Sequence, residues 1–402
     1  MPDENEHSPV DPQASDQSNR RDFLSGKGAI KAIRSGAIDK LELPAGVVNA
    51  AQSLERQSAY IEQYSKNAMA CEFELLFNLH QYPQSSAAAM LAFELIDKIE
   101  DQMTVYRDHS EVSQLNRTAS SAPVKLEENL FDVLTLAQQI HKETDGAFDI
   151  TSSVLTKLWG FDRRSGKLPA QPEIDQALKS VGAENIKLDS ENLTVEFVTQ
   201  LEINLGGIGK GHALDRVADL FAAKQVNDFV IHGGQSSVSA RGNSVTQNNP
   251  AGPNEPANSS PAPETPTTDT GWPVGVTHPT LPGVRLGEVT LRNQSLGTSG
   301  TGRQGFFHKG KRYGHIIDPR TGWPASHFLS TTVVSQSAAL SDALATAFFV
   351  MPIDQVETYC SNHPNVGAIL VLAGAKNRSN TASTGHVEIV SFNMTDQQWK
   401  TH

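Results

Sequence analysis

The chain has 402 residues, 38% of them hydrophobic, and a net charge of −12 at pH 7. This length suits one large domain with additions or two smaller ones, and the acidic balance argues against a nucleic-acid-binding surface. The only two cysteines, Cys71 and Cys360, provide neither a disulfide framework nor a zinc motif, and no apolar run approaches the length of a transmembrane helix. We therefore expect a globular protein with no nucleic-acid partner and no transmembrane segment.

The N-terminal region is polar and carries an incomplete export pattern. Asn19–Leu24 (NRRDFL) resembles a twin-arginine signal and hints at the cell envelope. However, charged residues within Gly26–Leu43, among them Lys27, Lys31 and Arg34, interrupt the apolar stretch that such a signal needs, which favours a cytoplasmic protein. We interpret residues 1–67 as an extension that is disordered at its start and partly helical over 23–66.

The folded domain is predicted to span residues 68–402, and an alternation of polar and apolar residues typical of a half-buried strand begins at Cys71. The predicted strands are Cys71–Leu79, Val195–Leu205, Asp228–His232, Trp272–Thr277, Val284–Arg292, Thr331–Ser335, Val366–Leu372 and Val387–Phe392. The predicted helices are Ser86–Glu100, Leu130–Glu143, Ile174–Val181, Gly211–Lys224 and the segment around Asp342. Long helices mixed with many strands, some of them in hairpins, predict an α+β fold with mixed or antiparallel sheets and packed helices.

One internal segment differs in composition from the rest. Asn243–Thr270 is rich in Pro, Asn, Ser and Thr, and it cannot bury enough apolar surface to offset its ordering entropy. We interpret it as a low-complexity insertion between two strands, not as a domain boundary.

A glycine-rich turn between a strand and a helix is the first candidate ligand site. In Ile203–Arg216 (INLGGIGKGHALDR) the glycines would let the backbone approach a ligand, and the start of the helix favours anions such as phosphate. The segment is neither a Walker A loop nor a complete dinucleotide fingerprint. A tight structural turn without a ligand explains it equally well.

Aromatic residues next to polar ones suggest a site for a flat ligand. Phe148 and Asp149 follow a glycine turn and could flank a heteroaromatic ring, and Tyr106 could stack on one. Trp159 and Phe161 are assigned to the core.

Two further segments suggest phosphate chemistry. Ser337–Phe349 (SAALSDALATAFF) is a helix of small residues in which Asp342 and Thr346 share one face. Their two oxygens suit Mg²⁺ held against a phosphate, although Asp342 could instead cap the helix and Thr346 fill the core. His315 in Arg312–Pro324 (RYGHIIDPRTGWP) is a candidate base.

Taken in order, these segments resemble the ApbE family, the FAD:protein FMN transferases, from about Ala68 to Phe392. The resemblance rests on the following motifs: AM at Ala68–Met69, VYR and SEVSQLN within Val105–Asn116, DGAFDIT and LWGF within Asp145–Phe161, NLGGIGKG and ALDR within Asn204–Arg216, TSG at Thr298–Gly300, HIIDPRTGWP and SAALSDALATA. It implies a T-fold-like architecture and an enzyme that uses FAD and Mg²⁺. Such an enzyme attaches FMN to a Thr or Ser hydroxyl in an Asp-x-Gly/Ser-Ala-Thr-like motif of an acceptor protein and releases AMP.

The resemblance also assigns roles to individual residues. Mg²⁺ is expected on the side chains of Asp342 and Thr346, with the backbone carbonyls of Gly209 and Ala345, and His315 and Asp342 are the expected catalytic residues. The expected FAD site consists of Met69, Tyr106, Ala147, Phe148, Asp149, Gly206, His212 and Ile316.

Departures from the family pattern affect the expected recognition of the acceptor protein more than the expected binding of FAD and metal. Gln235 stands where the family usually has Asp, and His212 where it has Tyr or Phe. Two alternatives stay open, namely an FAD pyrophosphatase in which water replaces the acceptor, and a protein that binds FAD without turnover.

Overall fold

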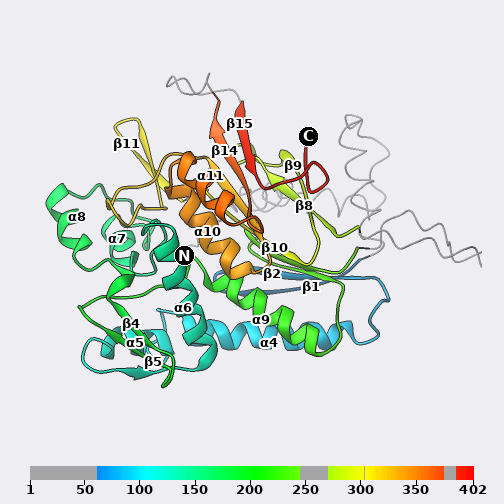
Figure 1. The fold of residues 1–402 in the computed structure, drawn as a ribbon, viewed down its shortest axis with the longest axis horizontal. Coiled ribbons are helices and arrows are strands. Elements are labelled where there is room, and N and C mark those ends of the chain that lie inside the picture. Colours follow the sequence, from blue (N-terminus) through cyan, green and yellow to red (C-terminus); the bar gives the residue numbers. More distant parts are fainter. Residues whose placement is uncertain (1–60, 245–269, 303, 375–385) are drawn as a thin grey trace, which may run out of the picture. The chain divides into compact units, whose positions relative to one another are not determined.

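An eight-stranded antiparallel sheet forms the centre of the structure, a computed structural model that describes residues 61–244, 270–302, 304–374 and 386–402 (Figure 1). In spatial order its strands are β1 (Ile61–Ala68), β2 (Cys71–Asn78), β6 (Phe229–Gly233), β7 (Ser237–Arg241), β10 (Gln294–Gly300), β13 (Ser330–Ser335), β14 (Gly367–Ala373) and β15 (Val387–Phe392). Successive side chains of a strand point to opposite faces, so the two faces of the sheet pack into two separate cores.

The two faces of this sheet are covered by different layers. Four helices bury one face, with Phe73, Leu75 and Phe77 of β2 in their shared core; they are α4 (Ser85–Met103), α6 (Glu128–Glu143), α9 (Gly209–Ala223) and α10 (Ala338–Val350). A three-stranded sheet covers part of the other face; its strands are β8 (Trp272–Thr277), β9 (Arg285–Leu291) and β16 (Trp399–Thr401).

The other elements extend the helical layer and surround its edge. They are α5 (Glu111–Thr118), α7 (Ser153–Leu158), α8 (Gln171–Leu178), η1 (Ala183–Asn185), α11 (Ile353–Asn362), the small sheet of β3 (Val124–Lys125), β5 (Thr194–Phe197) and β4 (Ile186–Asp189), and the hairpin of β11 (Gly305–His308) and β12 (Lys311–Gly314). Trp159 and Phe161 form a third core with the hairpin residues Phe306 and Tyr313, which confirms that these two aromatics are structural.

Helices α9 and α10 touch at the backbone. A Cβ atom built on Gly211 would lie 2.2 Å from the carbonyl oxygen of Ala338, so only glycine fits there. Asp215, one helical turn later, accepts hydrogen bonds from the N–H groups of Ala338 and Ala339 and from the Ser337 hydroxyl. The start of α10 is therefore fixed to α9, and α10 also lies close to β10, where a Cβ on Gly297 would be 2.5 Å from the Ser341 carbonyl.

Most of the predicted elements are confirmed, with ends that shift by up to three residues. The antiparallel sheet with packed helices also confirms the predicted fold class. Ser110 caps α5 by accepting from the Ser113 N–H.

Two assignments were wrong. The helical interpretation of 23–66 fails for residues 61–66, which belong to strand β1. The polar sequence of β1 is ordered by pairing with β2, and sequence periodicity does not reveal that partner. The strand predicted over Val195–Leu205 ends at Phe197. Beyond it, the backbone of Ile203 bonds to the side-chain amide of Asn116 at 2.8 and 3.0 Å, so buried residues there belong to a loop.

Other predictions concern residues that the structure does not describe. These are the disordered and partly helical extension up to residue 60, with its NRRDFL segment, and most of the low-complexity insertion, residues 245–269. The ends of that insertion lie next to each other, because the Ser244 N–H donates to the Gly271 carbonyl at 3.2 Å. Adjacent ends are the geometry expected of an insertion between two neighbouring strands.

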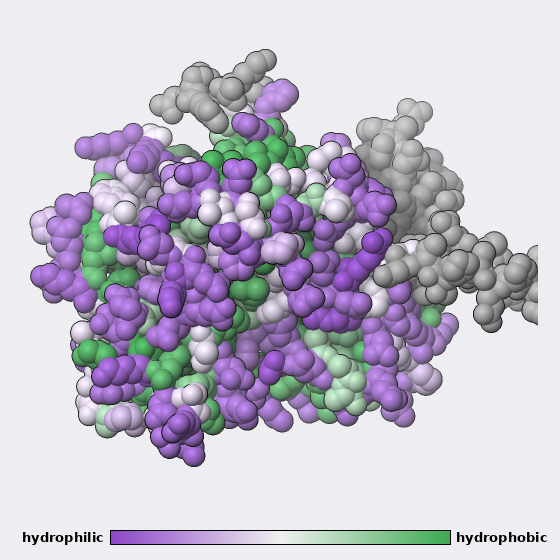
Figure 2. Space-filling view, in the orientation of Figure 1, coloured by the Kyte–Doolittle hydropathy of each residue, from purple (hydrophilic) through white to green (hydrophobic). Residues whose placement is uncertain are grey.

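The visible surface is mostly hydrophilic, with smaller hydrophobic groups between the polar side chains (Figure 2). Within the described part of the chain, no helix is both long enough and apolar enough to cross a membrane.

We predict that Gly211→Ala lowers the free energy of unfolding by about 1–3 kcal/mol, because the added methyl group would push α9 away from α10. Gly314→Ala is the matched control, since nothing lies within 4 Å of a Cβ built there. Urea denaturation of the two variants measures the difference. Equal stability of both variants and the wild type would contradict the tight α9–α10 contact.

Candidate functional site

A cavity of about 550 Å³ opens between the helical layer and the hairpin β11–β12, a volume typical of sites for small organic ligands. Segments far apart in the sequence line it. They are Val105–Tyr106, parts of 147–162, the glycine-rich loop 204–210, Ser236, Thr298–Gly300, the 315–319 loop, and Asp342 and Thr346 of α10. Nine of the residues singled out from the sequence meet here: Tyr106, Ala147, Phe148, Asp149, Gly206, His315, Ile316, Asp342 and Thr346.

One end of the cavity is a buried carboxylate next to hydroxyl groups. Asp342 is 7% exposed, and its Oδ2 accepts hydrogen bonds from the Gly211 N–H at 2.8 Å and the Ser237 hydroxyl at 2.9 Å. Burial raises the pKa of Asp342 to about 6, although the nearby Lys210 opposes the shift. Thr346, one turn further along α10, lies 3.0 Å from the Ser299 hydroxyl.

The chemistry of this end fits a hard cation such as Mg²⁺. Two oxygen-bearing side chains of one helix reach the cavity, and a cation would stabilise the buried carboxylate in its charged form. The alternative role of Asp342 as a cap is wrong, because Ser337 caps α10 by accepting from the Leu340 N–H. Gly209 and Ala345 do not line the cavity, and the Ala345 carbonyl already accepts from the Thr331 hydroxyl at 2.7 Å.

The glycine-rich loop presents a helix start to the cavity. Ile208 precedes α9 and offers no side-chain cap. The N–H groups of Gly209 and Gly211 already donate, to the Leu205 carbonyl at 2.7 Å and to Oδ2 of Asp342 at 2.8 Å, so an anion here would depend mainly on Lys210 and on the positive end of the helix dipole. Gly206 and Lys210 line the cavity beside this helix start. Lys210 was missed as a site residue, although a Lys within GIGKG at a helix start is a signal for phosphate.

His315 enters the cavity from the end of the β11–β12 hairpin. Its Nδ1 lies 3.3 Å from the Gln304 carbonyl oxygen, which can only accept, so Nδ1 carries the hydrogen and Nε2 keeps its lone pair. Burial lowers the pKa of His315, and the charge of Arg312 lowers it further. At neutral pH the side chain is therefore an uncharged base.

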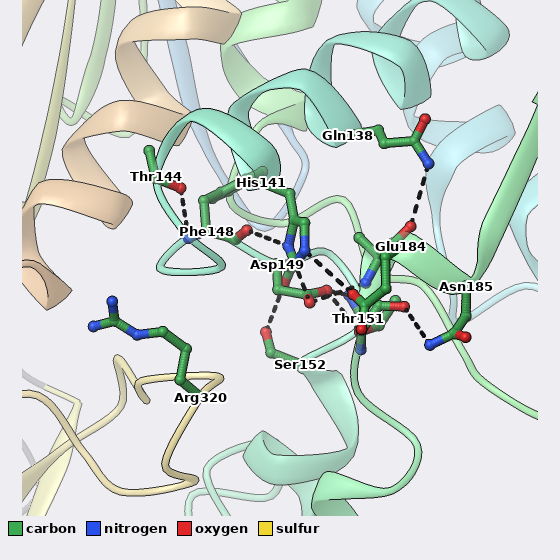
Figure 3. A network of polar contacts seen from close by, with 12 residues as sticks. Gln138, His141, Thr144, Phe148, Asp149, Thr151, Ser152, Glu184, Asn185 and Arg320 are labelled. Atoms are coloured by element: carbon green, nitrogen blue, oxygen red, sulfur yellow. Dashed lines mark hydrogen bonds and ion pairs between the residues drawn. The ribbon is translucent and has the colours of Figure 1, made fainter. Parts of the chain in front are cut away.

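The wall opposite contains Ala147, Phe148 and Asp149 in the turn after α6. Asp149 does not offer its carboxylate to the cavity as expected. Its Oδ1 accepts from the N–H and the hydroxyl of Thr151 at 2.7 and 2.6 Å, and its Oδ2 from the Ala183 N–H at 3.1 Å (Figure 3). Tyr106 differs from this wall, because it is 84% exposed and could move onto a ligand.

Two predicted flavin-site residues lie outside the cavity lining. Met69 forms the β1–β2 turn together with Ala70, both at positive φ (49° and 59°). His212 is 5% exposed, and burial lowers its pKa to about 4, with Arg216 adding to the shift. Within the described residues the Nε2 of His212 has no hydrogen-bond partner, and its charged neighbours Arg216 and Glu127 line a different hollow, beside α4.

Comparisons with known proteins identify the family of this chain. The model of the ApbE family matches residues 69–370. The chain is 29% identical over 319 residues to the FAD:protein FMN transferase of Klebsiella pneumoniae (strain 342), covering 78% of this chain and 90% of that protein. A solved structure of the ApbE protein from Thermotoga maritima, 26% identical, superimposes with a TM-score of 0.65 over 77% of this chain and 94% of that one. The flavin transferase ApbE from Vibrio cholerae, 22% identical, superimposes with a TM-score of 0.65 over 83% and 97% of the two chains and shares the fold.

We predict that Asp342→Asn stabilises the protein at pH 7 without divalent cations, by about 1–3 kcal/mol. The wild type must keep a buried carboxylate ionised above a pKa of about 6, whereas the same group ionises near pH 4 in the unfolded chain. The stability cost therefore appears as the pH rises from about 4 to about 6 and stays constant above that. Thermal unfolding at pH 4 and pH 7 measures it.

Added Mg²⁺ should make the wild type more stable than Asp342→Asn, because only the wild type offers a carboxylate to the ion. The melting temperature of the wild type should rise with Mg²⁺ and that of Asp342→Asn should not. An equal rise in both proteins would remove Asp342 from the metal site.

Proposed function

The chain belongs to the ApbE family, and from this premise we propose that it is an Mg²⁺-dependent FAD:protein FMN transferase. Its membership and the shared name of its relatives make it a transferase enzyme. The finer proposal is that it attaches FMN through a phosphoester to a Thr or Ser hydroxyl of an acceptor protein and releases AMP. The observation that carries it is one cavity lined by Lys210 at a helix start, by the carboxylate–hydroxyl pair of Asp342 and Thr346, and by His315.

FAD would lie along this cavity. Its pyrophosphate suits the ammonium of Lys210 and the positive end of the α9 dipole, which together offer positive charge. Its isoalloxazine ring suits the wall of Ala147 and Phe148, with Tyr106 free to close over it. Gly206 and Ile316 complete the expected contacts.

Asp342 and Thr346 would hold the Mg²⁺ ion, which would supply positive charge against the phosphates. The Ser237 hydroxyl and the Gly211 N–H orient the carboxylate from behind, so that its second oxygen is left for the ion. The carbonyls of Gly209 and Ala345 remain proposed ligands from the resemblance, and their use would require a local rearrangement, since neither residue lines the cavity.

His315 is the proposed base. Its Nε2 would take the proton from the acceptor hydroxyl, whose oxygen forms a bond to the phosphorus of the FMN half. The bond between that phosphorus and the bridging oxygen breaks, and AMP leaves with the electron pair. Phosphoryl transfer of this kind needs little covalent chemistry from the protein, so positioning and electrostatics provide most of the acceleration.

We expect mass spectrometry to find one FMN added to the Thr of a synthetic peptide with an Asp-x-Gly-Ala-Thr sequence, after incubation with the protein, FAD and Mg²⁺. EDTA should prevent the addition, and the same peptide with Val in place of Thr should stay unmodified. Release of AMP and free FMN with both peptides unmodified would contradict the transferase and favour an FAD pyrophosphatase.

We also predict that kcat/KM for transfer at saturating Mg²⁺ falls on the acid side with a midpoint below pH 6.5, because the base works only when neutral and burial lowers its pKa. His315→Gln should reduce the rate by about 10²–10⁴-fold while FAD affinity stays unchanged. His327→Gln, an exposed histidine outside the cavity lining, is the matched control. A normal rate in His315→Gln would remove the base assignment.

A further inference from the structure

His141 connects three segments next to the cavity (Figure 3). It lies in the last turn of α6, and its Nδ1 is 3.1 Å from the Phe148 carbonyl oxygen and 3.3 Å from Oδ2 of Asp149. Its Nε2 is 3.3 Å from Oε2 of Glu184 in η1. One imidazole therefore links the end of a helix, the turn that forms the cavity wall, and a 3₁₀ turn 43 residues further along the chain.

All of these partners accept hydrogen bonds and none donates. A neutral imidazole carries one N–H, so it can satisfy only one side, whereas an imidazolium satisfies both. The hydrogen bond to Asp149 raises the pKa of His141, against the effect of burial, and Glu184 adds to the rise. The partial negative charge at the end of α6 favours the same protonated form.

The network is more rigid on the Asp149 side. The Asp149 side chain is 2% exposed and receives three hydrogen bonds from Thr151 and Ala183, whereas the Glu184 side chain is 67% exposed. Bonds to a buried acceptor are worth more than bonds to one in water. The Nδ1–H of His141, not its Nε2–H, is therefore the contact that holds the wall.

This wall forms one side of the cavity. Ala147, Phe148 and Ile150 line it, and the Phe148 ring faces the glycine-rich loop, 3.1 Å from the place of a Cβ on Gly207. Four residues separate Thr144 from Asp149, and they are held to the end of α6 by backbone hydrogen bonds and by the Phe148 N–H, which donates to the Thr144 hydroxyl at 3.3 Å. Without His141 the Phe148 carbonyl would lose its partner.

His141, Asp149 and Glu184 also have the composition of a metal site. The geometry disfavours a metal, because the two nitrogens of His141 face different carboxylates and one ion can take only one of them. The Asp149 oxygens already accept three hydrogen bonds from the protein, which a cation would have to displace.

We propose that His141 is a positioning residue of the flavin cavity, which holds the Phe148–Asp149 wall in place through its Nδ1–H. The identity of the ligand rests on the proposed function, whereas the ordering of the wall does not. The charged groups facing His141 are Asp149 and Glu184; Arg320, on the other side of the turn, is paired with Asp318 and points away (Figure 3).

Two amide substitutions separate the roles of the two nitrogens. His141→Asn places an amide N–H near the position of Nδ1 and keeps the donor to the wall. His141→Gln places it near Nε2, so only the contact to Glu184 is kept. Flavin fluorescence titration should show FAD affinity within about twofold of the wild type for the Asn variant and about tenfold weaker for the Gln variant. In turnover, KM for FAD should rise in the Gln variant while kcat changes little.

The proton on His141 provides a readout that does not depend on activity. NMR titration of the wild-type imidazole should give a midpoint above 6.5, and Glu184→Gln should lower this midpoint while FAD affinity stays unchanged. A midpoint below 6.5 would overturn the ionised bridge. Equal FAD affinity in the Asn and Gln variants, whether normal or weak, would overturn the role of Nδ1–H.

Three further controls keep the outcomes distinct. If the wild type binds no FAD, the proposed function fails. The role of His141 in ordering the wall is then tested by the amide NMR shifts of Phe148 and Thr151. These shifts should change in His141→Gln and not in His141→Asn. If His141→Gln does not fold, the comparison of Glu184→Gln and His141→Asn with the wild type remains decisive. One equivalent of Zn²⁺ retained by the wild type and lost in both His141 variants would replace the proposal by a metal site.

Discussion

The backbone contact between α9 and α10 is the constraint on which the site depends. Gly211 allows the two helices to touch, Asp215 of α9 binds the first N–H groups of α10, and the Gly211 N–H donates to Asp342. The same contact therefore sets where α10 begins and which way its carboxylate points. Since the start of α9 also carries Lys210 into the cavity, the proposed phosphate side and the proposed metal side of the cavity are held in one unit.

The central sheet explains why α10 can reach the cavity at all. Helix α10 packs closely against strand β10 at Gly297, directly before Thr298–Gly300. The hydroxyl of Ser299 therefore lies next to that of Thr346. The hairpin β11–β12 approaches from the other side, where its Phe306 and Tyr313 pack on Trp159 and bring His315 into place. The side chains of His315 and Asp342 thus reach one cavity from elements that pack in two separate cores. Burial raises the pKa of Asp342 and lowers that of His315, so at neutral pH the histidine is uncharged and the carboxylate is poised to bind a cation.

The sequence predicted the elements whose periodicity is strong and local. The α9 and α10 helices and the strand beginning at Cys71 were found almost to the residue. Strand β1 was missed because its order comes from its partner β2, and the loop at Leu201–Leu205 was mistaken for a strand because its buried residues alternate while Asn116 satisfies its backbone. In both cases the deciding hydrogen bonds join residues that lie apart in the sequence.

The same division holds for the site. Composition, motif order and the spacing of Asp342 and Thr346 were sufficient to indicate a phosphate-handling enzyme, because residue chemistry and helical spacing are local properties. Only the tertiary structure decided which candidates share a cavity. In the structure the Asp149 carboxylate points inward to Thr151 and Ala183, and His212 lies outside the cavity lining. Lys210 lines the cavity, and His141 contacts Asp149 behind its wall. Direction and contact depend on packing between distant segments, and a linear pattern does not contain that information.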